Sequence, residues 1–202
     1  MRQLSADLTI DAPADQVWEV IGPGFARMGE WASVILASTA TPGPAGPACP
    51  GPACAGPACA GPAGSDGAPV TGRVCATGVR LVPRVTENLI AYDQARRTLS
   101  YQAQDLPALV TLARNTWTVV PVGEHRCRVA LQAQFQARGA LGVLAGWAVS
   151  VQTRRNARLL EADLSHYIRH GTPSPRKQRQ LRKAARRSPA GTSARLREPG
   201  GR

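Results

Sequence analysis

The first residues of the chain alternate between apolar and polar side chains, as a strand with one buried face does. Within residues 2–10 the apolar positions are Leu4, Ala6, Leu8 and Ile10, and Ser, Asp and Thr separate them. A period of two places the four apolar side chains on one face of the strand. We therefore expect a half-buried strand over residues 2–10.

A broken helix follows this strand. Four apolar residues within 14–21 share one helical face, which predicts a short amphipathic helix. The Gly-Pro-Gly sequence at 22–24 ends that helix, because proline removes a backbone donor and glycine tolerates reversed backbone angles. A second short helix is predicted over Phe25–Glu30. Residues 31–38 are predicted to return to strand.

Five more strand-like runs come later in the chain, and turn signals separate several of them. They span residues 71–77, 83–92, 98–103, 115–122 and 126–137. The last run alternates best. Its apolar side is Cys127, Val129, Leu131, Ala133 and Phe135, and mainly arginine and glutamine side chains take the other side. So clean an alternation is typical of an antiparallel sheet with one face in water.

A long helix closes the predicted domain. It runs from about Leu141 to His170, its apolar stripe includes residues 157, 160, 164 and 168, and Gly171 and Pro173 stop it. The predicted order is strand, two short helices, six strands and long helix, which is an α+β protein. An antiparallel sheet of about seven strands curls through its own twist, and a helix laid in the curve would not fill it.

We therefore expect an internal cavity between the sheet and the long helix. Apolar pockets commonly occupy such a space. The two short helices and the strand loops would close its remaining opening. Gly22, Gly24 and Gly29 offer hinges for a moving lip.

An insert interrupts the domain at about residues 39–69. It repeats a five-residue unit rich in proline, glycine, alanine and cysteine, so the every-third glycine of collagen is absent. We expect a low-complexity loop with extended backbone. Cys49, Cys54 and Cys59 repeat within it at a spacing that matches zinc ligands poorly. A metal site and redox or disulfide chemistry are the alternatives there.

Composition favours one domain with appendages. Hydrophobic residues make up 43% of the 202 residues, enough for a packed core, while aromatics are only 4%. We expect no signal peptide, because no N-terminal stretch has a charged start followed by an apolar core. The apolar run at 139–152 is shorter than the roughly 18 residues of a membrane span. A cytoplasmic domain over residues 1–171 is the resulting expectation.

The net charge of +12 belongs mainly to the end of the chain. Ten of the 25 basic residues, but only one of the 13 acids, lie in residues 172–202. Such a composition predicts a disordered basic tail. It is expected either to be merely solvated or to contact an anionic partner weakly and without specificity, either nucleic acid or a membrane surface. The oligomeric state is left open.

Three stretches of the sequence resemble a known family. They are "IDAPADQVWEVI…GEWASVI", "GRVCATG…RVTENLIAYDQARRTLSYQ" and "RNTWTVVPVGEHRCRVAL". Together they resemble the START-like (SRPBCC) superfamily with the helix-grip fold, in its polyketide cyclase/dehydrase branch. The resemblance spans about residues 5–172. The chain departs from the family pattern in two places. One is the insert, and the other is the turn at 123–125, which contains a single glycine where the family usually has a glycine-rich turn.

The resemblance implies a curved antiparallel sheet of about seven strands around a long C-terminal helix. It also implies a small hydrophobic or amphipathic ligand in the grip cavity, such as a polyketide, lipid or quinone. Some members of the family cyclise polyketides and others carry ligands. The family shares no catalytic motif, so the resemblance transfers no catalytic residue.

Glu87 and Tyr101 are the candidate catalytic residues. Glu87 alternates in phase with Val85, Leu89 and Ala91, which points it toward the apolar side. An unpaired carboxylate there would have a raised pKa and suit acid/base catalysis. The alternatives are a pair with Arg73 or Arg114, or exposure to solvent. Tyr101 is in phase with its apolar neighbours, so its hydroxyl needs a partner, either a ligand carbonyl or a protein group.

The candidate ligand-binding residues are mostly aromatic. Asn115 is expected to orient a ligand. Trp117 and Phe135 are expected as wall or core, and Trp31 and Trp147 are expected to line or gate the cavity; packing is the alternative for each. His166 and His170 have i, i+4 spacing but lack the accompanying glutamate of a metalloprotease. We expect no metal and no cofactor.

Two functions follow from these residues. The first is a carrier or sensor that binds a small apolar molecule. The second is a polyketide cyclase or dehydratase in which Glu87 and Tyr101 act as acid and base. Two or more convergent ionisable groups in the cavity would favour the enzyme, and a wholly apolar cavity would favour the carrier.

Overall fold

The computed structural model describes residues 1–42, 70–80, 82–138 and 140–187. The side chains of residues 140–151 and of Arg187 lie outside this description. So do Cys49, Cys54 and Cys59, on which the alternatives for the insert depend.

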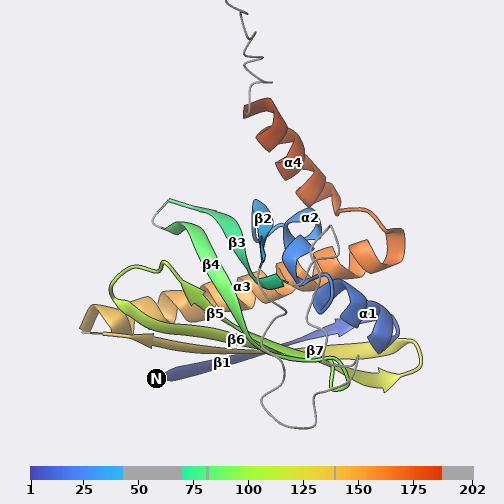
Figure 1. Ribbon diagram of the computed structural model, residues 1–202, viewed down its shortest axis with the longest axis horizontal. Helices are drawn as coiled ribbons and strands as arrows, with labels where there is room; N and C mark the ends of the chain where they lie inside the picture. The colour runs from blue at the N-terminus through green and yellow to red at the C-terminus, as the bar shows by residue number, and fades with distance from the viewer. Residues whose placement is uncertain (43–69, 81, 139, 188–202) are drawn as a thin grey trace, which may run out of the picture.

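One curved antiparallel sheet forms the body of the molecule (Figure 1). Across the sheet, the strands follow the order β1-β7-β6-β5-β4-β3-β2, and each is hydrogen-bonded to its neighbours in this order. The strands are β1 (Arg2–Ile10), β2 (Ala37–Pro42), β3 (Val70–Val79), β4 (Val82–Asp93), β5 (Thr98–Gln104), β6 (Val110–Gly123) and β7 (Arg126–Ala137).

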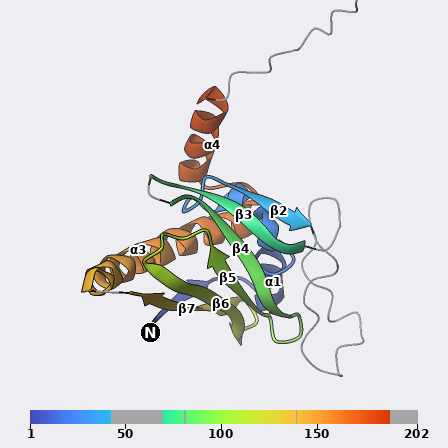
Figure 2. The same ribbon diagram turned by 60° about the vertical axis from the view of Figure 1, so that its left-hand side comes forward.

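The helices other than α4 (Pro175–Arg187) lie on one side of this sheet, and α4 projects away from the body (Figures 1 and 2). The helices on the sheet are α1 (Ala14–Ile21), a 3-10 turn η1 (Phe25–Arg27), α2 (Met28–Trp31) and the long α3 (Ala140–His170). The long helix crosses the inner side of the curved sheet, and the short helices fill the space beside it. This is the expected α+β helix-grip fold.

The N-terminal elements form where the hydrophobic pattern placed them. Leu8 and Ile10 of β1 are each only 1% exposed, and the predicted face of α1 is buried throughout. The break after α1 differs from expectation in its backbone. Gly22 and Gly24 have φ values of −80° and −78°, so neither adopts a reversed angle. Gly22 is needed because a Cβ there would collide with the Trp18 ring.

Two strand boundaries and the phase of one strand differ from the sequence prediction. The strand predicted over residues 31–38 begins later than expected, because Trp31 ends α2 and β2 begins only at Ala37. Strand β6 begins at Val110, five residues before the predicted start, because it continues to pair with β7. In β4 a register shift between Leu89 and Ala91 reverses the phase. Tyr92, at 5% exposed, therefore faces the core in place of Ala91.

The core lies between the sheet and the helices. Strand β7 contributes Cys127 and Val129, both fully buried, and α3 contributes Leu160 and Leu164 from its predicted stripe. Helix α3 ends as predicted at Gly171, whose φ of +65° is a left-handed conformation that glycine adopts without strain.

The prediction of disorder throughout residues 172–202 is wrong over Pro175–Arg187, which form helix α4. The physical reason is long-range. Lys177 is fully buried and its ammonium donates hydrogen bonds to the carbonyls of Ile35 (2.8 Å) and Leu36 (3.0 Å). These hydrogen bonds to a segment distant in the sequence hold the start of the helix. The local charge pattern could not predict them, because it contains no information about that segment.

Candidate functional site

A cavity of about 340 Å³ lies between the inner face of the sheet and α3. Polar residues cluster at one part of its wall, and apolar residues make up most of the remainder. The polar members are Arg73, Thr77, Glu87, Tyr101, Asn115, Gln152, Thr153 and Asn156. The apolar members are Leu4, Met28, Val34, Ile35, Val79, Trp117, Leu131, Ala133, Ala157 and Leu160.

A buried ion pair forms the polar centre of this wall. Strands β3 and β4 pair Arg73 directly with Glu87, and Arg73 Nε donates to Glu87 Oε2 at 2.6 Å. The side chain of Arg73 is 3% exposed and that of Glu87 is 15% exposed. Glu87 therefore points into the cavity as its phase predicted. It is paired, however, and the partner is Arg73, one of the two arginines considered from the sequence.

Further contacts fix the Arg73 guanidinium in place. Its Nη1 donates to the carbonyl of Phe25 at 2.6 Å, and its centre lies 4.0 Å from the Phe25 ring and 5.3 Å from the Tyr101 ring. Burial opposes the charge on Arg73, but the Glu87 carboxylate more than offsets this, so the pKa of Arg73 is raised. The cavity thus contains a permanent, rigidly held cation.

Tyr101 and Asn115 extend the polar cluster. They are direct cross-strand partners on β5 and β6, and the Tyr101 side chain is buried at 5% exposed. Burial raises the pKa of Tyr101 far above its ordinary value, and the Glu87 carboxylate adds to this effect. The hydroxyl therefore stays protonated at neutral pH and acts as a hydrogen-bond donor. It does not act as a base in the resting protein.

A cysteine that the sequence analysis did not single out belongs to the same cluster. Cys75 is 1% exposed, and its thiol lies 3.6 Å from Glu87 Oε2. Burial raises the pKa of the Cys75 thiol to about 12. A protonated, buried thiol is a poor nucleophile, so Cys75 is a packing residue and a weak donor to Glu87.

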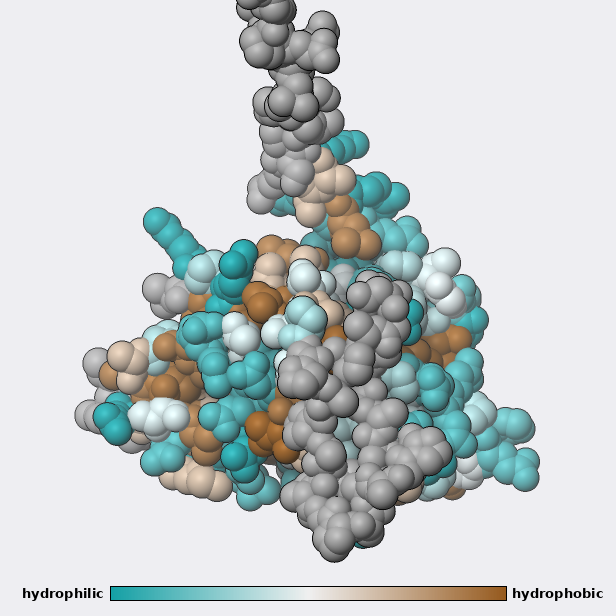
Figure 3. All heavy atoms as spheres, in the orientation of Figure 1, coloured by the Kyte–Doolittle hydropathy of each residue, from teal (hydrophilic) through white to brown (hydrophobic). Residues whose placement is uncertain are grey.

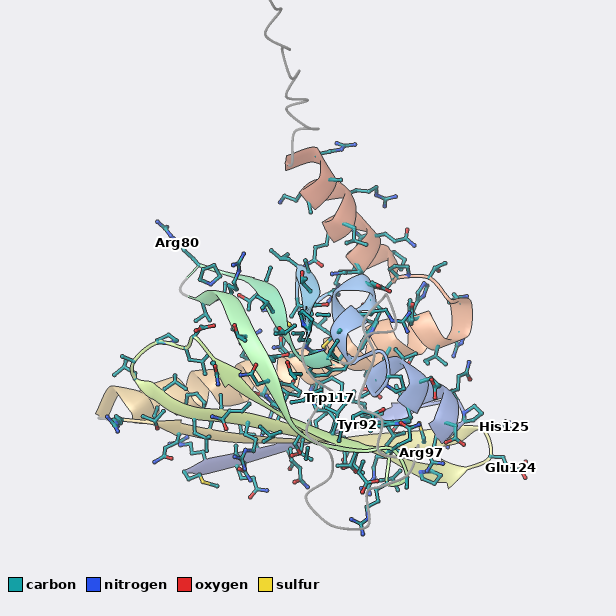
Figure 4. The ribbon with its side chains drawn as sticks, viewed as in Figure 1. Arg80, Tyr92, Arg97, Trp117, Glu124 and His125 are labelled. Carbon is teal, nitrogen blue, oxygen red and sulfur yellow. The ribbon has the colours of Figure 1, made fainter. Side chains whose placement is uncertain are left out.

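The aromatic candidates take different places. Trp117 lines the cavity and belongs to the core, as Figure 4 shows from its place inside the fold. Trp31 is 2% exposed and lines a second space of only about 10 Å³, enough for about one water. It does not stand at an open lip. Phe135 is half-buried beyond Ala133 on β7 and does not line the cavity. The side chain of Trp147 lies outside the described residues.

Helix α3 supplies polar lining residues that sequence reasoning missed. Gln152, Thr153 and Asn156 face the cavity beside Ala157 and Leu160. The signal was available, because these positions continue the apolar stripe of the helix by one further turn. Following the same helical face toward the N-terminus of α3, into these polar residues, would have predicted that this part of the helix lines a cavity.

One edge of the cavity is tied to the C-terminal helix. Segment 33–36 contributes Val34 and Ile35 to the lining, and the Ser33 amide donates to Asp163 Oδ2 at 2.7 Å. The other oxygen of Asp163 accepts from Ser174 Oγ at 2.5 Å. Asp163 thus joins segment 33–36, α3 and the start of α4.

The described part of the chain contains neither a candidate metal site nor a candidate membrane-spanning helix. No group of three or more histidine, cysteine, aspartate or glutamate residues there is placed to hold a metal ion. The rings of His166 and His170 lie 4.5 Å apart without a third ligand. No helix over these residues is long and apolar enough to span a bilayer.

Comparison with known proteins places this geometry in context. A family model described as polyketide cyclase / dehydrase and lipid transport matches residues 1–166, which is most of the chain. No curated protein matches the sequence.

Solved structures show the same fold at low identity. The di-domain ARO/CYC protein BexL of the BE-7585A biosynthetic pathway is 19% identical with a TM-score of 0.61; the match covers 83% of this chain and 47% of BexL, so this chain spans about half of that protein. The Zhui aromatase/cyclase from Streptomyces sp. R1128 is 15% identical over 86% of this chain and 99% of its own, with a TM-score of 0.58.

A START superfamily protein from Mycobacterium smegmatis is 12% identical, with a TM-score of 0.58, over 85% of this chain and 100% of its own. At these identities the likeness concerns the fold alone.

Proposed function

Because the chain belongs to the polyketide cyclase/dehydrase and lipid transport family, we propose that it binds a small amphipathic molecule in its internal cavity, as a carrier or sensor. The ligand is of polyketide, lipid or quinone type. Its oxygen-bearing end lies against the cluster of Arg73, Glu87, Tyr101 and Asn115. Its apolar part lies along the wall formed by Leu4, Val34, Ile35, Leu131, Ala133, Ala157 and Leu160.

The observation that carries this proposal is a cavity with a divided lining. A volume of about 340 Å³ falls in the range of small-molecule pockets, which typically combine an apolar wall with a few convergent polar groups. A wholly apolar cavity would take a hydrocarbon without orienting it. Here the polar cluster lies on neighbouring strands and therefore gives the ligand one preferred direction.

The polar cluster favours oxygen acceptors on the ligand. A guanidinium has five N–H donors, and the two described hydrogen bonds of Arg73 use Nε and Nη1. The protonated hydroxyl of Tyr101 and the amide of Asn115 supply further donors nearby. A carbonyl, phenolic or carboxylate oxygen on the ligand would accept hydrogen bonds from these donors.

The second candidate function is a polyketide cyclase or dehydratase. Three ionisable groups on one wall, Arg73, Glu87 and Tyr101, favour it by the criterion set from the sequence. In this function Tyr101 donates to a ligand carbonyl and Arg73 stabilises the resulting enolate oxygen. Glu87 removes the proton from carbon, which requires its carboxylate to exchange part of its contact with Arg73 for the ligand.

Filling the cavity tests the binding proposal. We expect Ala133→Phe, which adds a ring to the lining, to weaken binding of the anthraquinone emodin or of oleate by at least about tenfold, or ~1.4 kcal/mol. Binding is measured by quenching of tryptophan fluorescence, to which Trp117 in the lining contributes. Ala130→Phe is the matched control, because Ala130 is on the opposite face of β7. Native mass spectrometry of the purified protein identifies any ligand retained from the host.

The same protein distinguishes the two functions. Turnover of a linear poly-β-ketone thioester by the wild type supports the enzyme, provided that Glu87→Gln and Tyr101→Phe each lower turnover by a larger factor than they lower binding. Binding without turnover supports the carrier. If the wild-type protein neither retains a molecule nor binds either probe, and Ala133→Phe behaves as Ala130→Phe does, both functions fail.

A further inference from the structure

Helix α4 has a strongly one-sided charge that the cavity does not explain. Its sequence PRKQRQLRKAARR contains seven arginine and lysine residues and no acid. An isolated helix of this composition gains little from its own charges, because like charges repel across each turn. Its formation here therefore depends on what holds it to the body.

A single buried lysine is the centre of that attachment. Lys177 is fully buried, and its Nζ donates to Ile35 O, Leu36 O and Gln180 Oε1 at 2.8, 3.0 and 3.0 Å. Gln180 Nε2 also donates to Ser33 O at 3.2 Å. The first two turns are thus fixed to segment 33–36, and the rest of α4 projects away from the body (Figures 1 and 2).

The remaining basic side chains of α4 are left on the surface. Those described as exposed are Arg176, Arg179, Arg182, Lys183 and Arg186. Helical spacing groups these five cations on one side of α4, while Leu181, at 38% exposed, and the two alanines fall on the side of Lys177. Figure 3 accordingly shows hydrophilic and hydrophobic atoms side by side on this helix. We call this exposed surface the basic face of α4.

The basic face borders a groove that adjoins the ligand cavity. The groove has a volume of about 620 Å³ and is lined by Leu36, Gly78, Arg179, Gln180, Lys183 and Ala184. Ile35, Thr77 and Val79, the sequence neighbours of Leu36 and Gly78, line the cavity. The groove and the cavity therefore lie on two sides of the same edge of the fold.

The hairpin between β3 and β4 adds to the same edge. Val79 is 53% exposed and Leu36 is 38% exposed, although both are large apolar side chains. Arg80 at the tip of the hairpin is exposed and points away from the body (Figure 4). Exposed cationic and apolar side chains thus lie on the same edge beside the cavity.

We propose that this edge, formed by the basic face of α4, Leu36, Val79 and Arg80, docks on an anionic phospholipid membrane. Cationic side chains bind the negative surface, while exposed aliphatic side chains enter the headgroup region. Nucleic acid would use the cations equally well, but it gives the exposed side chains of Leu36 and Val79 no apolar environment. The membrane is therefore the partner that satisfies both kinds of side chain.

Docking in this orientation places the cavity edge against the bilayer. Segment 33–36 lines the cavity and also holds α4. A membrane contact at α4 is therefore separated from the ligand site by this one segment. The inference goes beyond ligand binding and does not require it, because the cations of α4 and the exposed side chain of Leu36 lie outside the cavity lining.

The test is binding of the full chain to vesicles. The probe is phosphatidylcholine vesicles with 30% phosphatidylserine, compared with pure phosphatidylcholine, in a sedimentation assay at low and at high salt. Each basic residue near such a surface changes the partition coefficient by about fivefold, so Arg179→Gln with Lys183→Gln is expected to lower it by about 25-fold. Val79→Ser, which removes the most exposed apolar side chain of this edge, is expected to lower it by about threefold or more.

The matched control removes two positive charges elsewhere. Arg155→Gln with Arg158→Gln changes exposed residues on α3 and is expected to stay within about twofold of the wild type. All variants replace exposed side chains, and circular dichroism confirms that they fold.

The proposal is overturned by any of three results. They are equal binding to both vesicle types, an equal loss in the α3 control, and displacement from vesicles by a 20-nucleotide RNA that binds more tightly through Arg179 and Lys183.

Discussion

The burial of Lys177 makes a specific prediction about how stability depends on pH. Burial lowers the pKa of Lys177 from its usual 10.5 to about 8, although the Asp163 carboxylate offsets part of this effect. Since one pKa unit corresponds to about 1.4 kcal/mol, the charged lysine costs the folded protein about 3 kcal/mol at pH 7. Between pH 8 and 10.5 the unfolded chain holds a proton that the folded protein has released. Folding therefore becomes more favourable as pH rises through this window.

Replacing Lys177 by methionine removes this dependence. At a single neutral pH the result is ambiguous, because the variant avoids the cost of the buried charge but leaves the carbonyls of Ile35 and Leu36 without donors, at about 1–3 kcal/mol each. The pH dependence separates the two effects. We expect the unfolding free energy of the wild type, minus that of Lys177→Met, to rise by about 2–3 kcal/mol between pH 7 and pH 10.

Urea unfolding followed by tryptophan fluorescence measures this difference. Tyrosine and cysteine groups with raised pKa values also titrate in the alkaline range, and the subtraction removes their contribution because both proteins contain them. Lys183→Met is the matched control, since Lys183 is on the same helix and exposed. A difference for Lys177→Met that stays flat with pH would show that α4 is not held by a buried ammonium, and would refute the reasoning.

Two further substitutions test the packing around the site by urea unfolding. Arg73→Met is expected to cost about 3–5 kcal/mol because it leaves Glu87 without its buried partner, and Arg73→Met with Glu87→Leu is expected to recover most of that loss; a double variant no more stable than the single one would contradict this. Gly29→Ala is expected to cost about 1–3 kcal/mol, because its Cβ would meet the backbone of Ala37 and Ser38. Gly123→Ala, which meets nothing, should change stability little, and equal effects at both glycines would contradict the packing argument.

Local periodicity accounts for the parts of the fold that were predicted well. The face of α1, the alternation of β7 and the lower stripe of α3 each depend on residues close in sequence, whose spacing alone says which side is buried. Periodicity fails where the register of a strand shifts. In β4 the shift after Leu89 brings Tyr92 into the core, and the pattern of apolar residues does not predict this shift.

The sequence predicted which residues line the candidate site, but it did not predict which of them contact one another. The phases of Glu87 and Tyr101 place both side chains inside, and both line the cavity. The pairing of Glu87 with Arg73 required the register of β3 against β4, which joins residues 14 positions apart. The sequence left Arg114 as an equal alternative, because either arginine satisfies the charge.

The pattern of apolar and polar residues was sufficient to predict most of the strands, the broken helix and the long helix, since those follow from spacing over a few turns. The family was predicted from the resemblance of three sequence stretches. Tertiary structure alone established that Lys177 is buried and that α4 is a docked helix. A lysine among arginines is ordinarily exposed, and only the carbonyls of Ile35 and Leu36, about 140 residues away, supply the hydrogen bonds that make its burial stable. No local preference encodes a partner so distant in the chain.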